Sequence, residues 1–297
     1  MRTQILGTIV VLLLSFSIST AQQTYSPFVK TGPQEKAVLE ISNEISAALS
    51  AKNFEIVGQY KPMQSDDLLV ICFSRKDLKQ ASLAFKDRGA LASVLKIGLQ
   101  KSGSSVTVSL QNPLYMFYAY FRADFDKQKS VLTSIDSDAK SVLSGLYGEL
   151  IPFGGELSAD KLSNYHYKMM MPYFDDPTTL ETYASFEEGL AHIQARLENA
   201  TGVKKVYEQV FADKKTAVFG LAFIDQEKGE AKYLPIIGES HLAAMPYEII
   251  LQGNEVTMLP GKYRIALYWP ELTMGTFMKI MSTPGNIEDA FKEVTKK

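Results

Sequence analysis

The sequence contains a single cysteine, Cys72, so no disulfide can form within the chain and disulfide-stapled folds are excluded. Histidine is also scarce, with 3 residues among 297, and none stands at the spacing of a Cys/His zinc site. We therefore expect stability to come from packed hydrophobic cores rather than from disulfides or a structural metal.

An excess of charge of either sign is missing as well. The 31 Lys and Arg residues stand against 33 Asp and Glu residues, which gives a formal net charge of −2. This balance predicts no nucleic-acid partner and no general attraction to an anionic membrane. Catalytic motifs are absent too: the sequence has neither a G-x-S-x-G element, nor a P-loop, nor a dinucleotide-binding glycine fingerprint. We predict no catalytic residue and no cofactor.

A long apolar run occurs only at the start of the chain. In MRTQILGTIVVLLLSFSISTA, Arg2 is the only charged residue, and an apolar core extends from Ile5 to Ile18. The small residues Ser19 and Ala21 stand at positions −3 and −1 before Gln22, which is typical of a secretory signal peptide. The run is shorter than the roughly 20 residues of a membrane span. We predict a signal peptide at 1–21, a periplasmic or extracellular mature protein, and no membrane span.

Two hairpin patterns are the most informative feature that is present. VLKIGLQKSGSSVTVSL (94–110) and YEIILQGNEVTML (247–259) both predict two strands joined by a turn, with Gly103 and Gly253 at the turns. Each follows a helical pattern and two strand-like runs. Corresponding positions in the two halves of the chain keep a steady offset. It is 149 residues from Phe54 to Val203 and 153 residues from Lys96 to Ile249. Such a steady offset indicates a tandem repeat even where the sequence identity between the two copies is low.

The predicted helices share an apolar stripe at helical spacing, and the predicted strands are apolar or alternating. In 185–202, Ser185 and Glu188 form a capping box. The expected helices are 33–54, 129–148, 185–202, 272–281 and 286–294, and the expected strands outside the hairpins are 54–60, 68–74, 115–121, 203–211, 216–224 and 263–269.

These patterns predict an α+β fold of two tandem repeats, 28–150 and 160–297, each a mainly antiparallel sheet with helices on one face. An open sheet edge or face invites pairing with another copy, and a second repeat supplies that partner within the chain. We therefore predict a pseudo-two-fold pair of domains, a monomer in solution, and a functional cleft near the contact between the two repeats.

The segment from Leu68 to Pro113, LLVICFSRKDLKQASLAFKDRGALASVLKIGLQKSGSSVTVSLQNP, resembles the middle of a small bacterial α/β domain, the domain-of-unknown-function family three-zero-two. SFEEGLAHIQARLENATGVKKV and YLPIIGESHLAAMPYEIIL resemble parts of the same domain in the second half. Cys72 lies near the family's cysteine, but Phe73-Ser74-Arg75 follows it instead of Asn-Pro. The resemblance implies a fold rather than an activity.

Aromatic residues after each hairpin predict a ligand-binding groove. Tyr118 and Tyr120 lie in one aromatic run, Trp269 ends the other, and His241 lies in the second repeat. We interpret the protein as an exported, non-enzymatic binder of an unknown small ligand or an envelope protein, with these four residues at the site. Aromatic residues of this kind also occur as plain sheet core.

Two alternatives remain open. The first is a hydrolase or redox enzyme that uses His241, beside Glu239 and Ser240, or the thiol of Cys72. The second is a soft-metal or haem site on His166 with a methionine of the run 169–171, since copper(I) prefers such ligands. The run YHYKMMMPYF also fits an edge strand ended by Pro172, in which neighbouring methionines face opposite sides.

Overall fold

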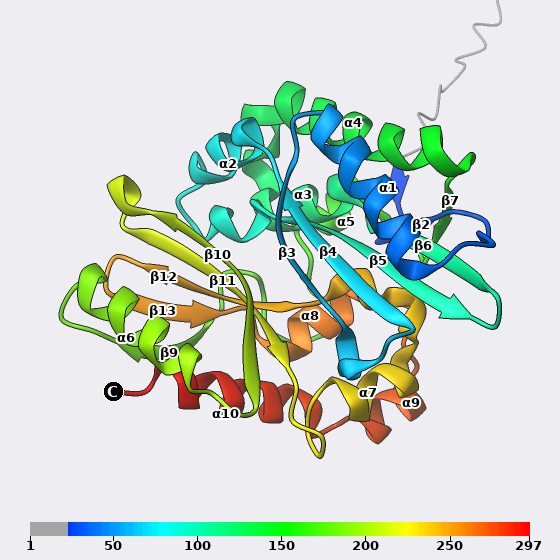
Figure 1. Cartoon of the computed structure of the whole chain (residues 1–297). Helices are drawn as coiled ribbons and strands as arrows, with labels where there is room; N and C mark the ends of the chain where they lie inside the picture. The colour runs from blue at the N-terminus through cyan, green and yellow to red at the C-terminus, as the bar shows by residue number, and fades with distance from the viewer. Residues whose placement is uncertain (1–22) are drawn as a thin grey trace, which may run out of the picture.

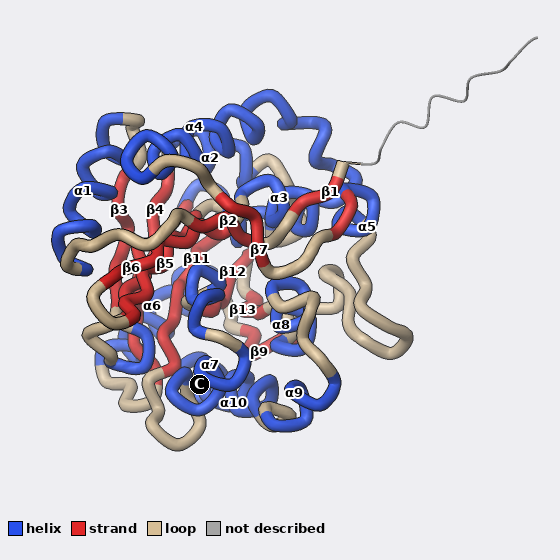
Figure 2. The backbone as a smooth tube through the Cα atoms, turned by 90° about the vertical axis from the view of Figure 1, so that its right-hand side faces the viewer, coloured by secondary structure: helices blue, strands red, loops and turns tan. Residues whose placement is uncertain are grey.

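The computed structural model describes residues 23–297, so the predicted signal peptide lies outside the described residues. The described chain is α+β, with antiparallel sheets placed between two groups of helices (Figure 1). Helices α1 (Val38–Ala51), α2 (Lys76–Leu83) and α4 (Lys129–Tyr147) lie on one side of the strands, and α6 (Phe186–Glu198) and α10 (Thr283–Thr295) lie on the other (Figures 1 and 2). The predicted fold class is thereby confirmed at the level of an α+β chain with antiparallel sheets.

The first sheet contains six strands within residues 23–297, in the order β3-β4-β5-β6-β2-β7. The hairpin predicted at 94–110 is present as β5 and β6, which pair in register from Ile97 with Leu110 to Ser102 with Ser105. β2 pairs with β6 on one side and with β7 on the other. The strands are β2 (Phe28–Lys30), β3 (Glu55–Tyr60), β4 (Leu68–Ser74), β5 (Leu95–Ser102), β6 (Ser105–Gln111) and β7 (Ile151–Phe153).

The second sheet contains five strands in the described chain, in the order β10-β11-β12-β13-β9. The hairpin predicted at 247–259 is present as β12 and β13, and β9, which comes first in the chain, pairs beside β13. β9 thus holds the place in this sheet that β2 holds in the first. The strands are β9 (Thr178–Thr182), β10 (Val203–Phe211), β11 (Thr216–Phe223), β12 (Tyr247–Gln252) and β13 (Glu255–Met258), and a separate pair joins β1 (Thr24–Tyr25) to β8 (Leu157–Ser158).

The helices that cover the sheets form where the sequence predicts them. α1 buries Ile41, Ile45 and Leu49 at helical spacing. α6 begins after Ser185, whose Oγ accepts a hydrogen bond of 3.1 Å from the amide of Glu188, as expected for an N-cap. The buried hydrophobic side chains of both sheets and their helices form one continuous cluster.

Glycines allow the two sheets to approach closely. A Cβ on Gly58 of β3 would overlap the carbonyl oxygen of Val206 on β10, so these two edge strands can touch only because position 58 has no side chain. A Cβ on Gly98 of β5 would lie 2.6 Å from Cδ1 of Leu242, in the 3-10 segment Glu239–Ala244. The segment after α7 (Glu230–Ile237) therefore packs directly onto the first sheet.

The two aromatic runs predicted as strands are helices. They form α3 (Pro113–Phe121) and α8 (Gly261–Tyr268), and seven residues of each are buried. Aromatic residues favour strands on intrinsic propensity, but burial on all sides removes any alternation and packing decides the conformation. Pro113 occupies the first turn of α3, where its missing N–H has no cost. The short helices α5 (Ala159–Ser163) and α9 (Met274–Lys279) complete the fold.

The interpretation of Tyr165–Phe174 as an edge strand is also wrong. The segment between α5 and β9 contains turns and no strand. Met170 has φ of 69°, in the left-handed region that a strand cannot contain. Nowhere in residues 23–297 is a helix both long and apolar enough to span a bilayer.

Candidate functional site

His241 and Trp269 lie together at an aromatic contact between the two sheets. Their rings stack with centroids 5.6 Å apart. Phe28 of β2 and Phe153 of β7 pack edge-on against His241 at 5.1 and 5.4 Å. His241 and Trp269 are both predicted at one site, and the structure brings these two side chains into contact.

Tyr118 and Tyr120 make different contacts. Tyr120 is buried, and its hydroxyl accepts a hydrogen bond of 3.2 Å from Tyr268. Tyr118 is half-buried and stacks on Phe125 and Tyr25 with centroids 3.9 and 5.2 Å away. The four residues singled out in the sequence therefore do not line one common surface.

A small apolar cavity opens beside Trp269, and we call it the Trp269 groove. Its volume is about 120 Å³. α8, α9 and the loop between α5 and β9 form its walls, and in Figure 2 these segments lie on the same side of the molecule. The described residues that line it are Tyr167, Met171, Lys262, Ile265, Ala266, Trp269, Leu272, Met274 and Phe277.

The groove combines apolar walls with one charge at the edge. Lys262 is the only charged residue among those that line it, and its side chain is exposed. Ligand sites are typically concave and mostly apolar with a few polar groups that orient the ligand. All lining residues come from the second half of the chain, so the groove lies beside the contact between the sheets rather than inside it.

A second cavity, larger and polar, lies between the C-terminal end of α6 and α10. It has a volume of about 790 Å³ and is lined by side chains of both charges, among them Arg196, Asp225, Lys292 and Glu293. Arg196 donates a hydrogen bond of 2.7 Å to the backbone carbonyl of Glu293, so the helices themselves satisfy part of its charge. Mixed charge on an open surface predicts solvation rather than a specific ligand.

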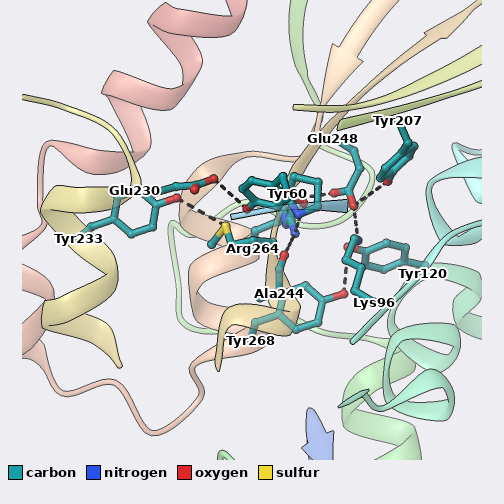
Figure 3. Close-up of polar contacts among 12 residues, drawn as sticks. Tyr60, Lys96, Tyr120, Tyr207, Glu230, Tyr233, Ala244, Glu248, Arg264 and Tyr268 are labelled. Atoms are coloured by element: carbon teal, nitrogen blue, oxygen red, sulfur yellow. Dashed lines mark hydrogen bonds and ion pairs between the residues drawn. The ribbon is translucent and has the colours of Figure 1, made fainter. Parts of the chain in front are cut away.

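Three buried charges connect the two sheets at their centre (Figure 3). The Lys96 ammonium forms an ion pair with Glu248 Oε1, and Arg264 Nη1 donates to Glu248 Oε2 at 2.7 Å. None of the three side chains is more than 4% exposed. Burial lowers the pKa of Lys96, and the carboxylate of Glu248 offsets part of that effect.

Further hydrogen bonds hold Arg264 and Glu248 in this cluster. Burial alone would lower the pKa of Arg264, but Glu248 and neighbouring tyrosines raise it, so the guanidinium is charged. Its nitrogens also donate to the backbone carbonyls of Ala244 and Pro246. Tyr207 donates to Glu248 Oε1 at 3.3 Å. These contacts link β5 of the first sheet to β12 of the second and to α8.

Glu230 forms a second buried polar contact between the two halves. Tyr60 of β3 donates a hydrogen bond of 3.0 Å to Glu230 Oε1, and the amide of Phe223 approaches the same oxygen at 3.3 Å. Burial raises the pKa of Glu230 to about 7, more than these hydrogen bonds lower it. The carboxyl group therefore changes charge close to neutral pH.

Cys72 lacks the features of a reactive thiol. It lies in the middle of β4 with no exposed surface, and burial raises the pKa of its thiol to about 12. A nucleophilic or redox-active cysteine needs a lowered pKa and access to solvent. Its environment is that of a small core side chain.

His241 has a neighbouring serine, one of the two partners that the histidine of a catalytic triad needs. Ser240 Oγ lies 3.1 Å from His241 Nδ1, and burial lowers the pKa of the imidazole to about 4, with Lys30 adding to the effect. The imidazole is therefore neutral at pH 7. Glu239 accepts a hydrogen bond from Gln100 at 3.2 Å, and no carboxylate of residues 23–297 bonds to His241. The acid that orients a triad histidine is missing.

His166 and the methionine run lie on the loop between α5 and β9. His166 Nε2 lies 2.9 Å from the backbone carbonyl of Met171, and its ring stacks on Tyr173 with centroids 4.0 Å apart. Met169 and Met170 are 88% and 96% exposed. Within the described chain, no cluster of three His, Cys, Asp or Glu side chains could hold a metal ion.

Comparisons with known proteins give little beyond the structure itself. No protein-family model matches the chain, and no curated protein matches it. One solved structure that is similar to part of this chain is described as the crystal structure of uncharacterized conserved protein DUF302 from Bacillus stearothermophilus. The similarity covers 40% of this chain and 96% of that one, with 9% identity and a TM-score of 0.35. The family named here is the one that the sequence resembles.

The buried charges were not predicted from the sequence. Lys96 lies within VLKIGL, Glu248 within YEIIL and Arg264 within YRIALYW, and each is the one charged residue of an otherwise apolar or aromatic run. A lone charge in such a run is rarely tolerated without a partner. That signal, applied to both hairpins, would have indicated a buried ion pair.

Proposed function

We propose that the chain is an exported, non-enzymatic binding protein that holds an apolar group in the Trp269 groove. It is made of two tandem α+β copies, approximately 28–150 and 160–297, related by a pseudo-two-fold axis and monomeric in solution. The signal-peptide pattern at 1–21 supports export to the periplasm or the extracellular space.

The strand ladders support the duplication. A register shift occurs just before Gly58 in edge strand β3 and just before Tyr207 in edge strand β10, and the second sheet has a further shift between β13 and β9. Gly58 pairs with Cys72 and Cys72 with Lys96; Tyr207 pairs with Gly220 and Gly220 with Glu248. Lys96 and Glu248 therefore hold the same position in the two ladders.

Contacts between equivalent positions support the two-fold relation. Lys96 and Glu248 form an ion pair with each other, and Tyr120 and Tyr268, the eighth residues of α3 and α8, share a hydrogen bond. Contact between matching positions is what an isologous, two-fold interface produces. Since the partner surface is already supplied within the chain, no second molecule is needed.

The observation that carries the binding function is the Trp269 groove. It is an open apolar cavity of about 120 Å³, walled by two helices and a loop. That volume suits an alkyl or aromatic group of a few carbons rather than a whole large ligand. A non-enzymatic role is supported by the buried thiol of Cys72 and by the missing acid beside His241.

Trp269 is the only tryptophan of the chain, so its fluorescence reports on the groove without a label. The probe is 6-bromohexan-1-ol, whose bromine quenches tryptophan on contact. We expect saturable quenching. We expect Ala266→Leu, which fills the groove, to weaken binding roughly tenfold, because the burial of two methylenes is worth about 1.6 kcal/mol.

The matched control is Ala290→Leu, which makes the same change in the wall of the polar cavity beside α10. It should leave the quenching curve unchanged. Quenching that rises linearly and equally in all three proteins would mean collision rather than binding, and the groove would not be a ligand site. Thermal melting followed by circular dichroism checks that both variants are folded.

A further inference from the structure

We propose that the face around the Trp269 groove docks onto an anionic lipid bilayer. Exposed methionines occur on the loop after α5 and in and just after α9, two segments that wall the groove, and we call Met169, Met170, Met274, Met278 and Met281 the methionine surface. In the described chain these five are the only exposed methionines, and all are more than half exposed. This inference goes beyond the proposed function, because it concerns the surface outside the groove.

The methionine surface borders the groove from two segments, the loop after α5 and α9. Met274 lines the groove together with Met171, which directly follows Met169 and Met170 in the chain. Met274 and Met278 are four residues apart in α9, so they share a face of that helix. In Figure 2 the loop that leaves α5 projects from the molecule beside α8. Large exposed apolar patches on a soluble fold mark interaction sites.

The charges around the methionine surface select an anionic occupant. Lys168 lies on the projecting loop, Lys262 on α8 and Lys279 at the end of α9, and all three are exposed. In the described chain none of them forms an ion pair with a carboxylate, and the Lys168 ammonium lies 5.2 Å from the Tyr167 ring centroid. Glu271, between α8 and α9, and Asp176, on the projecting loop, add two negative charges, while Asp175 on that loop is paired with Arg122. The net charge of the whole chain hides this local excess of positive charge.

A bilayer fits these features better than a protein surface does. The two most exposed apolar side chains, Met169 and Met170, lie in a turn of the projecting loop, where Met170 has φ of 69°. Flexible methionines can enter the acyl region, while tyrosines and lysines with long apolar stems occupy the headgroup boundary. The groove opens on the same face, so an apolar group could pass from the bilayer into it without crossing water.

The test uses the exported protein and vesicles of phosphatidylcholine, either alone or mixed in equal parts with phosphatidylglycerol. Co-sedimentation measures the partition coefficient. We expect binding to the mixed vesicles that weakens as salt is added, because surface charge attraction is screened. Replacing all three lysines (Lys168→Gln, Lys262→Gln, Lys279→Gln) should lower the partition coefficient roughly 100-fold, since each lysine near an anionic surface contributes about a factor of five.

The apolar contribution is tested separately. Met169→Ser with Met170→Ser should lower the partition coefficient by about tenfold or more. The matched control is Leu39→Ser, which removes an exposed apolar side chain, 71% accessible, from α1 on the other side of the strands. It should bind as the unaltered protein does.

Equal binding by all variants, or no binding to mixed vesicles, would overturn the proposal. Self-association that depends on Met169 and Met170, without vesicle binding, would assign the surface to a second copy and overturn it as well. The 6-bromohexan-1-ol titration is made without lipid. Saturable quenching without vesicle binding would therefore overturn bilayer docking but not the groove as a ligand site. Vesicle binding without quenching would overturn the groove as a ligand site but not bilayer docking.

Discussion

Tyr60 on β3 donates a hydrogen bond of 3.0 Å to the buried carboxyl group of Glu230 on α7, so an edge strand of the first sheet is joined to a helix of the second half. Glu230 is only 1% exposed, so a buried titratable group lies between the two halves. Its protonation is therefore tied to the stability of the whole chain.

Burial raises the pKa of Glu230 from 4.5 to about 7, so the folded chain holds a proton that the unfolded chain has lost between these pH values. Its stabilising contribution is fully present below pH 4.5 and is lost as the pH rises through 7. Relative to Glu230→Gln, we expect the unaltered protein to lose about 3 kcal/mol of unfolding free energy between pH 4.5 and pH 8.

Urea denaturation at several pH values measures this difference. The comparison with Glu230→Gln is needed because His241, with a pKa lowered to about 4, makes stability rise with pH in the range where Glu230 makes it fall. His241 is present in both proteins, so its contribution cancels. Parallel stability curves for the two proteins would contradict the prediction.

The buried cluster of Lys96, Glu248 and Arg264 predicts which substitution lowers the free energy of unfolding more. Glu248→Gln leaves Lys96 and Arg264 as two buried cations without a carboxylate, whereas Lys96→Met leaves the pair between Glu248 and Arg264 intact. We expect Glu248→Gln to lower the free energy of unfolding by about 3–5 kcal/mol, and Lys96→Met by clearly less.

Urea denaturation at pH 7 compares the two variants. Lys61→Met serves as a control, because its pair with Asp66 is exposed on both sides and its removal should change nothing measurable. If Lys96→Met proves as damaging as Glu248→Gln, the cluster is not organised around Glu248.

Gly58 predicts a steric effect at the contact of the two edge strands. In Gly58→Ala the new Cβ meets the backbone carbonyl of Val206, which cannot move aside as a flexible side chain could. We expect destabilisation of about 1–3 kcal/mol or more. Gly32→Ala is the matched control, because a Cβ there has no neighbour within 4 Å and the backbone is not left-handed. Differential scanning calorimetry should show a lower melting temperature for Gly58→Ala alone.

Cys72 should react only when the fold opens. Since the thiol is buried and its pKa is raised to about 12, we expect iodoacetamide at pH 8 to leave the native protein unmodified. Labelling in urea should follow the fraction unfolded, as intact mass shows. Rapid stoichiometric labelling of the native protein would revive a redox role for Cys72.

Local patterns could predict the hairpins and the covering helices, because their apolar periodicity matches their final burial. The Ser185 cap and the stripe of Ile41, Ile45 and Leu49 are examples. The aromatic runs at 115–121 and 263–269 could not be assigned in this way. They are enclosed on nearly every side, so no face of the helix stays polar enough to reveal its period.

The candidate site was predicted only in part, for a similar reason. Trp269 and His241 were selected as rare residue types, and they do meet. The groove itself is made by three segments brought together by the fold, of which α9 and the loop after α5 carry no recognisable motif. The local basic charge around it cancels in the sum over the whole sequence.

The strand order also determines when the first sheet can close during synthesis. Phe28 at the start of β2 has its partners at Gln111 and Phe153, so its ladder cannot form until more than half of the chain has been made. Pairings between such distant positions slow folding. A slow-folding polypeptide spends longer as an extended polymer, the form that a narrow translocation channel can thread. If the chain is exported, as we propose, the topology that delays closure leaves time for passage across a membrane before the fold is complete.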